Sequence, residues 1–185
     1  MHVRHIAAAS LLAFSAAHAM AADPTASLTS LHQSFAEYTD AGPVGNNNIN
    51  TNTLYWMKEK AGTWMGQQVQ SWFLMWDPAT SERVQGSVTF DANILYLHDS
   101  KAELQLTDDF KKADVAYNYS RSSVGLEAGD RSNTSFSGNT LQLRWTASNP
   151  GDHVRVMTAV PEPGTYALMA AGLAVLGFAA RRRKA

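Results

Sequence analysis

The stretch Thr140-Leu141-Gln142-Leu143-Arg144-Trp145-Thr146 alternates strictly between apolar and polar side chains. Successive side chains of an extended chain point to opposite faces, so Leu141, Leu143 and Trp145 would share one face and Gln142 and Arg144 the other. This two-residue period is typical of a strand with one buried and one solvated face, as in antiparallel sheets. The stretch therefore predicts a half-buried antiparallel strand.

Short runs of similar composition recur on both sides of this stretch. They are rich in β-branched and aromatic residues and are separated by turn formers such as Asp77-Pro78. Val154 and Val156 alternate with Arg155 in the same way, which assigns Arg155 to the polar face. We predict a mainly β protein with a single antiparallel β-sandwich domain, its strands lying at residues 69–76, 84–90, 94–97, 115–119, 140–146 and 154–158.

Residues 69–76 carry apolar side chains on both faces, with Trp72 and Leu74 on one and Phe73 and Met75 on the other. A strand of this kind is expected at the centre of the body, buried on both sides. An alternative is that a large flat aromatic stacks on a sugar ring, because tryptophan offers apolar area together with a polar edge. The candidates for sugar stacking are Trp56, Trp64 and Trp72.

Before these strands, residues 22–52 differ in pattern. Leu28, Leu31, Phe35 and Tyr38 share one face at helical spacing, which predicts a short helix, and an Asn/Gly-rich loop comes next over residues 40–52. The β-sandwich body is accordingly expected at residues 53–159. Residues 100–113 fit either a strand with a charged turn after it or a short helix.

The N-terminus has the three zones of a secretory signal peptide. Arg4 supplies the positive charge, an apolar run begins at Ile6, and small residues at Ala19 and Ala21 offer two cleavage positions to signal peptidase. Residues 1–21 are therefore predicted to be a cleaved signal helix. The alternative is the buried N-terminal helix of a protein that is not exported.

The C-terminus combines three elements in a fixed order. Pro161-Glu162-Pro163 is a stiff, extended segment, because proline fixes φ and pushes the preceding residue out of the helical region. Residues 164–180 carry no charge and would span about 25 Å as a helix, near the ~30 Å of a hydrocarbon core. The third element is a basic stop-transfer cluster, formed by Arg181, Arg182, Arg183 and Lys184.

This arrangement over residues 160–185 resembles the PEP-CTERM sorting signal. The resemblance implies a substrate of exosortase, a membrane enzyme that processes the chain near Pro161-Glu162-Pro163. It also implies a precursor held transiently in the inner membrane by a transmembrane helix at 164–180, with its body in the periplasm. The processed protein would then reach the cell surface or the extracellular space. A plain membrane anchor is the alternative.

The body also resembles a group of β-rich PEP-CTERM exported proteins without an assigned activity. The matching pieces are Gly86-Ser87-Val88-Thr89-Phe90-Asp91, Gly125-Leu126-Glu127 and the segments around Gly138 and Gly151. They read as strands and turns. The resemblance therefore implies fold and export but no activity.

Charge and composition exclude several classes of function. Five of the 15 Lys and Arg residues and one of the 16 Asp and Glu residues lie in the terminal segments, leaving 10 basic and 15 acidic residues in the body. An acidic body argues against nucleic-acid binding, which needs a surplus of positive charge. The chain has no cysteine, so disulfides, thiolate metal sites and cysteine nucleophiles are excluded.

No residue pattern indicates catalysis, a cofactor or a metal site. His32, His98 and His153 lie far apart, and no Gly-x-Ser-x-Gly elbow accompanies the pair His98 and Asp99. Aspartates gather near predicted turns, where they most often act as turn formers, although calcium is an alternative. They are Asp91, Asp99, Asp108, Asp109, Asp130 and Asp152.

The sequence thus favours a non-enzymatic envelope or extracellular matrix protein, exported and sorted by exosortase, with a structural or biofilm role associated with exopolysaccharide. The first alternative is a carbohydrate- or calcium-binding β-sandwich module, which predicts a row of exposed aromatics or three carboxylates converging on one point. An extracellular hydrolase is the less favoured alternative.

Overall fold

The computed structural model describes residues 21–160, apart from positions 31, 46 and 149, together with residue 172. The body forms one compact unit over residues 21–161. The predicted signal helix and the predicted transmembrane helix lie almost entirely outside the described residues. Among the residues that are described, no helix is long and apolar enough to cross a membrane.

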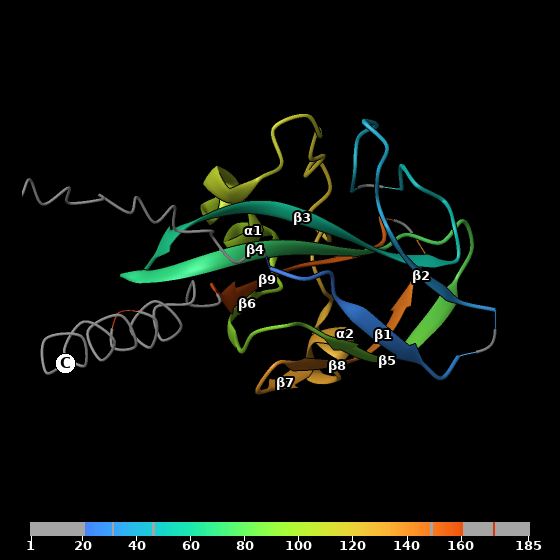
Figure 1. Cartoon of the computed structure of the whole chain (residues 1–185). Coiled ribbons are helices and arrows are strands. Elements are labelled where there is room, and N and C mark those ends of the chain that lie inside the picture. Colours follow the sequence, from blue (N-terminus) through green and yellow to red (C-terminus); the bar gives the residue numbers. More distant parts are fainter. Residues whose placement is uncertain (1–20, 31, 46, 149, 161–171, 173–185) are drawn as a thin grey trace, which may run out of the picture. The chain divides into compact units, whose positions relative to one another are not determined.

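The body is a β-sandwich of two sheets (Figure 1). One sheet has four strands in the order β1 (Thr25–Leu28), β5 (Glu82–Thr89), β8 (Thr140–Ala147) and β7 (Ser135–Ser137). The other has five in the order β2 (Ser34–Glu37), β3 (Thr53–Trp64), β4 (Gln67–Trp76), β9 (Asp152–Ala159) and β6 (Ile94–His98). All strand pairs are antiparallel except β2 and β3, which are parallel. The mainly β sandwich predicted from sequence is confirmed.

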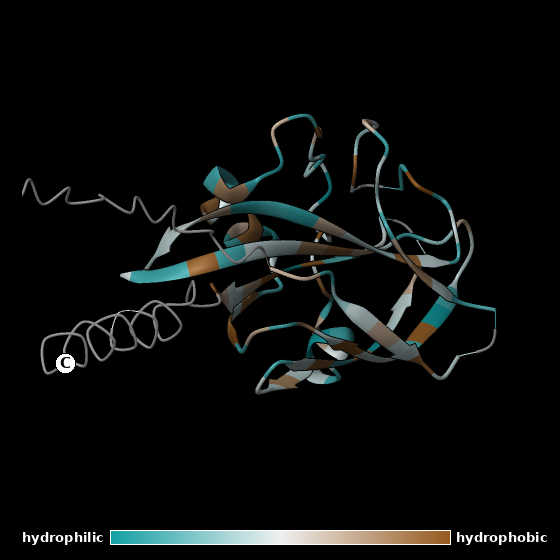
Figure 2. Ribbon diagram, in the orientation of Figure 1, coloured by the Kyte–Doolittle hydropathy of each residue, from teal (hydrophilic) through white to brown (hydrophobic). Residues whose placement is uncertain are grey.

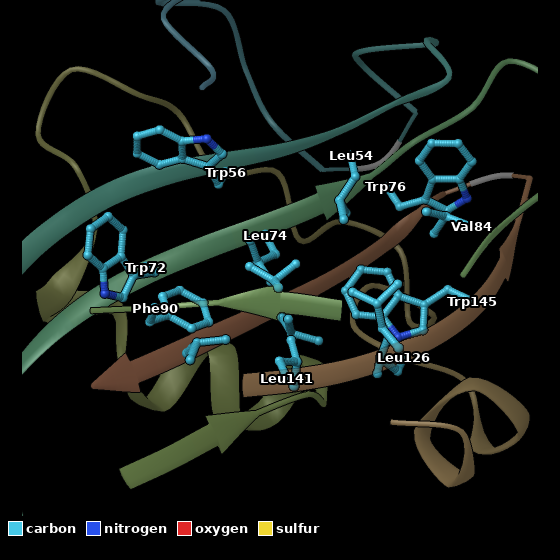
Figure 3. Close-up of a cluster of buried hydrophobic side chains, with 14 of the residues drawn as sticks. Leu54, Trp56, Trp72, Leu74, Trp76, Val84, Phe90, Leu126, Leu141 and Trp145 are labelled. Atoms are coloured by element: carbon cyan, nitrogen blue, oxygen red, sulfur yellow. The ribbon is translucent and has the colours of Figure 1, made fainter. Parts of the chain in front are cut away.

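Strand β8 alternates as its sequence predicts. Leu141, Leu143 and Trp145 are buried between the sheets, whereas Gln142 and Arg144 are exposed. The buried side chains pack against residues of the opposite sheet to form the main core (Figure 3). In that view Trp72 and Phe90 lie towards one end of the cluster, and Trp76 and Trp145 lie towards the other.

Strand β4 is the centre of the five-stranded sheet, and both of its faces are covered. Trp72 and Leu74 point into the core between the sheets, while Phe73 and Met75 point into a second cluster on the opposite face. Its first two residues are exposed and its other residues are buried, and Figure 2 shows the hydrophilic start of the strand. The predicted central strand is confirmed.

The second cluster is covered by helix and loop instead of a third sheet. Helix α1 (Lys101–Leu106) and the 3-10 turn η1 (Asp108–Phe110) come after β6 and place Leu104 in this cluster. The start of α1 is fixed by a capping box in which Ser100 and Glu103 satisfy each other's backbone N–H groups. Of the two structures that fitted residues 100–113, the helix is therefore the one that forms.

The helix predicted between Leu28 and Tyr38 is wrong, because β1 and β2 occupy this region. The body therefore begins near Thr25, well before the predicted boundary at residue 53. Strand β1 pairs with β5 where Gly86 has a φ of 154°, and a side chain there would collide with the backbone of Ser27. Long-range pairing of this kind overrides a short helical pattern.

Two further predictions of strands need correction. Residues 115–119 form no strand, and Tyr117 makes one isolated bridge to Val44. Strand β3 was not predicted, although it is the longest strand among the described residues. A third short helix, α2 (Ala128–Ser132), lies before β7 and contacts β8.

The alternation along β8 makes a paired prediction. Leu141→Ala should lower the free energy of unfolding by about 2 to 5 kcal/mol, because it leaves a cavity between the sheets. Gln142→Ala, one residue along on the exposed face, should change it by no more than about 0.5 kcal/mol. Urea denaturation with tryptophan fluorescence as the signal measures both. Equal losses from the two variants would contradict the assigned faces.

Candidate functional site

A buried ion pair lies on the face of the five-stranded sheet that α1 covers. Arg155 of β9 donates to both carboxylate oxygens of Glu59 in β3, with Nε–Oε2 at 2.6 Å and Nη2–Oε1 at 2.9 Å. Both side chains are fully buried. The alternation along β9 assigned Arg155 to the polar face, and that face is covered instead of solvated.

Further hydrogen bonds complete the surroundings of this pair. Glu59 also accepts from the hydroxyls of Ser71 at 2.6 Å and Tyr117 at 2.8 Å. Arg155 Nη1 donates to the carbonyl of Leu104 at 2.8 Å and to the hydroxyl of Thr107. Burial, and after it the Glu59 carboxylate, raises the pKa of Tyr117, so this phenol stays a hydrogen-bond donor. The network fastens α1 to the sheet.

Breaking one side of the pair should be costly. Arg155→Met should lower the free energy of unfolding by about 3 to 5 kcal/mol, because Glu59 is left as an uncompensated buried charge. The double variant Glu59→Leu with Arg155→Met should lose less than the sum of the two single variants. Denaturant titration measures the cycle, with the exposed Arg144→Met as control. Single losses as small as that of the control would contradict the structural role.

A second cluster of charged groups lies at the end of the sandwich where β9 begins. Glu127 precedes α2, Asp130 lies within α2, and Asp152 is the first residue of β9. One carboxylate oxygen from each lies within 4.8 Å of the others. We call these three residues the acidic triad.

Burial differs sharply among the members of the acidic triad. Asp152 is 0% exposed, and neither of its carboxylate oxygens has a hydrogen-bond partner among the described residues. Asp130 Oδ1 accepts from the backbone N–H of Thr146 at 3.0 Å, and Glu127 is exposed. Burial, and after it the charges of Asp130 and Glu127, raises the pKa of Asp152 to about 9.

A small hollow lies beside Glu127, one member of the acidic triad. Its volume is about 60 Å³, and it is also lined by Thr146 at the end of β8 and by Ser148 and Gly151 of the turn that comes next. The sequence singled out Asp130 and Asp152 as turn aspartates and predicted no metal site. It missed Glu127 as a partner of Asp152. These two residues are brought together by the position of α2 beside β9, and their spacing in the sequence does not reveal this contact.

The tryptophans proposed for sugar stacking differ in exposure. Trp72 is 0% exposed and donates from Nε1 to the Thr158 hydroxyl at 3.1 Å, and Trp56 is 6% exposed. Neither ring offers a face to a ligand, so both assignments are wrong. Trp64 is half-buried at the end of β3, where it lines a cavity of about 300 Å³ together with Lys60, Asp109 and other residues.

Among the described residues, His98 and His153 do not form the triad that a hydrolase would need around Asp99. The Asp99 carboxylate accepts from Arg131 Nε at 2.7 Å. His98 packs edge-on against Trp64, and burial lowers its pKa. His153 is fully buried and stacks on Phe73 at 5.9 Å between ring centroids.

Comparison with known families identifies the segment that comes after the body. The family model of the PEP-CTERM protein-sorting motif matches residues 159–184. The chain carries a PEP-CTERM motif. The predicted sorting residues Pro161, Glu162 and Pro163 and the basic cluster Arg181 to Lys184 fall inside the matched range, and outside the residues that the structure describes.

The motif indicates how this PEP-CTERM protein is sorted. It indicates an exported protein that exosortase sorts, with a membrane-anchored precursor. No curated protein matches the chain. No solved structure matches it either. The resemblance of the body to a β-rich PEP-CTERM group therefore stays an expectation.

The PEP-CTERM motif begins on the sheet itself. The match starts at Ala159, the last residue of β9, which is the register partner of Val69 in β4. The next residue, Val160, donates its backbone N–H to the carbonyl of Gln68 at 3.3 Å. The folded body and the sorting motif are thus contiguous.

Proposed function

We propose that this PEP-CTERM protein is a non-catalytic envelope or extracellular matrix protein. The sorting motif that is joined directly to a β-sandwich carries the proposal. The buried Arg155–Glu59 network supports it, because its polar groups satisfy one another in the interior instead of being presented to a substrate. The signal peptide at 1–21 and final release to the cell surface belong to the same proposal.

The contact with exopolysaccharide is the finer part of this proposal. The cavity beside Trp64 supports it, because an aromatic wall with Lys60 and Asp109 at hand offers both stacking and hydrogen bonds to a sugar. The exposed Leu106 also lines this cavity. The carbohydrate-binding alternative therefore rests on Trp64 alone among the three tryptophans first considered.

The sorting claim predicts a change in processing. Pro161→Ala combined with Glu162→Ala should leave the precursor in the membrane fraction and abolish release of the body, because the segment that exosortase reads is altered. Intact-mass analysis of the released and membrane-bound forms measures this, and it also shows whether the chain starts after Ala19 or Ala21. Arg144→Ala, on the exposed face of β8, is the matched control. Unchanged release of the double variant would contradict sorting.

The carbohydrate contact predicts a separate effect. Trp64→Ala should weaken retention on immobilised exopolysaccharide, purified from the producing cells, by roughly two- to ten-fold, because a stacking surface is removed. Phe136→Ala is the control, since Phe136 is an exposed aromatic on β7 of the other sheet. Retention that is equal in wild type and in both variants would contradict the contact and leave the sorting claim untouched.

A further inference from the structure

The acidic triad presents a problem that the described protein groups do not solve. Asp152 is 0% exposed, and both of its carboxylate oxygens lack a donor among the described residues. A buried polar group without a partner destabilises the folded state, and it does so more strongly when it is charged. A proton shared with Glu127 would satisfy one oxygen of Asp152 and leave the other without a partner.

The neighbours of Asp152 add negative charge in place of relieving it. Carboxylate oxygens of Glu127 and Asp130 lie within 4.8 Å of those of Asp152. The nearby Arg131 guanidinium is directed elsewhere, donating to Asp99 at 2.7 Å and to the Leu126 carbonyl at 3.3 Å. A cation between the three carboxylates would supply the missing partner to both Asp152 oxygens at once.

The chemistry of the ligands selects the kind of cation. All three side chains offer carboxylate oxygen, which suits hard divalent cations and disfavours the softer metals that prefer histidine or cysteine. Calcium accepts irregular geometry with six to eight oxygens, including bidentate carboxylates and water, whereas magnesium requires a near-ideal octahedron. The triad combines two side chains from the start of α2 with one from the start of β9, and this irregular arrangement suits the more tolerant ion.

The triad is reached from its exposed side. The hollow of about 60 Å³ beside Glu127 has room for waters that would complete the coordination of an ion, since a water occupies about 30 Å³ in the liquid. Glu127 is exposed and marks the side from which an ion enters, while Asp152 is buried. We propose that Glu127, Asp130 and Asp152 bind one calcium ion that joins α2 to the start of β9.

The bound ion would hold α2 against the start of β9 at this end of the sandwich. Asp152 is the register partner of Trp76, and the adjacent His153 donates its backbone N–H to the Gly125 carbonyl at 3.3 Å, so β9 and the segment before α2 are already in contact. Bound calcium stabilises the folded state by mass action, because the unfolded chain does not hold the triad together. This inference goes beyond the proposed envelope role and does not depend on sorting by exosortase.

The test uses the full chain purified in detergent and stripped with EDTA. Addition of 10 mM calcium chloride should raise Tm by about 3 to 5 °C for a dissociation constant near 1 mM, which is usual for extracellular calcium sites. Isothermal titration calorimetry should give one site per chain. Magnesium chloride at the same concentration should give a smaller shift, and an equal shift would overturn the choice of calcium.

Terbium reports the position of the site. Because Trp76 is the register partner of Asp152, excitation of tryptophan should sensitise luminescence from terbium bound in the triad, and calcium should quench it by displacement. If the luminescence persists when calcium is added, terbium and calcium do not share the site and the assignment is contradicted.

Three variants test which residues bind the calcium ion. Asp152→Asn should lower calcium affinity at least ten-fold and abolish the Tm shift, while without calcium its Tm should stay close to that of wild type, because a neutral amide replaces a buried carboxyl of similar size. Glu127→Gln alters an exposed side chain and keeps the test valid if Asp152→Asn does not fold. Asp109→Asn, an exposed carboxylate on η1, is the control and should respond as wild type. A calcium response that persists in both triad variants, or is missing in wild type, would overturn the proposal.

Discussion

The bidentate ion pair between Arg155 and Glu59 is the constraint on which the covered face of the five-stranded sheet depends. It reaches from β9 to β3 across the intervening β4, with the guanidinium over the ring of Phe73 at 5.6 Å from its centroid. An isolated charge in this interior would strongly destabilise the folded state. Both partners and their hydrogen-bonding neighbours must therefore be in place together. That requirement fixes α1, through Leu104 and Thr107, at one position on the sheet.

The opposite face depends mainly on apolar packing. Trp72, Trp76 and Trp145 are fully buried between the sheets, and they supply much of the area that a domain without disulfides must remove from water. Strand β4 takes part in both arrangements, since its odd-numbered residues lie under the ion pair and its even-numbered tryptophans lie in the main core. The two faces of one strand thus connect an electrostatic network with a hydrophobic one.

The local alternation of side chains predicted strands such as β4 and β8 but missed β3, which also packs on the core, and long-range partners decided what local pattern could not. Leu141, Leu143 and Trp145 were placed correctly because a two-residue period is a property of the strand itself. Arg155 obeys the same period, but the period does not reveal that α1 and its loop cover the second face. Glu127 and Asp130 are three residues apart at the start of α2, but Asp152 meets them only through the position of α2 beside β9, which no spacing in the sequence reveals.

The direct continuation of β9 into the sorting motif has a mechanical consequence. While the tail is attached, any tension from the membrane enters the body at Ala159, the last residue of β9. β9 lies between β4 and β6, and the hydrogen bonds of antiparallel strands run perpendicular to the strand, so a pull along β9 would load the bonds to both neighbours in shear. A tether on an edge strand such as β7 would be resisted by one neighbouring strand alone. The tail is therefore attached to a strand that two neighbours hold in place.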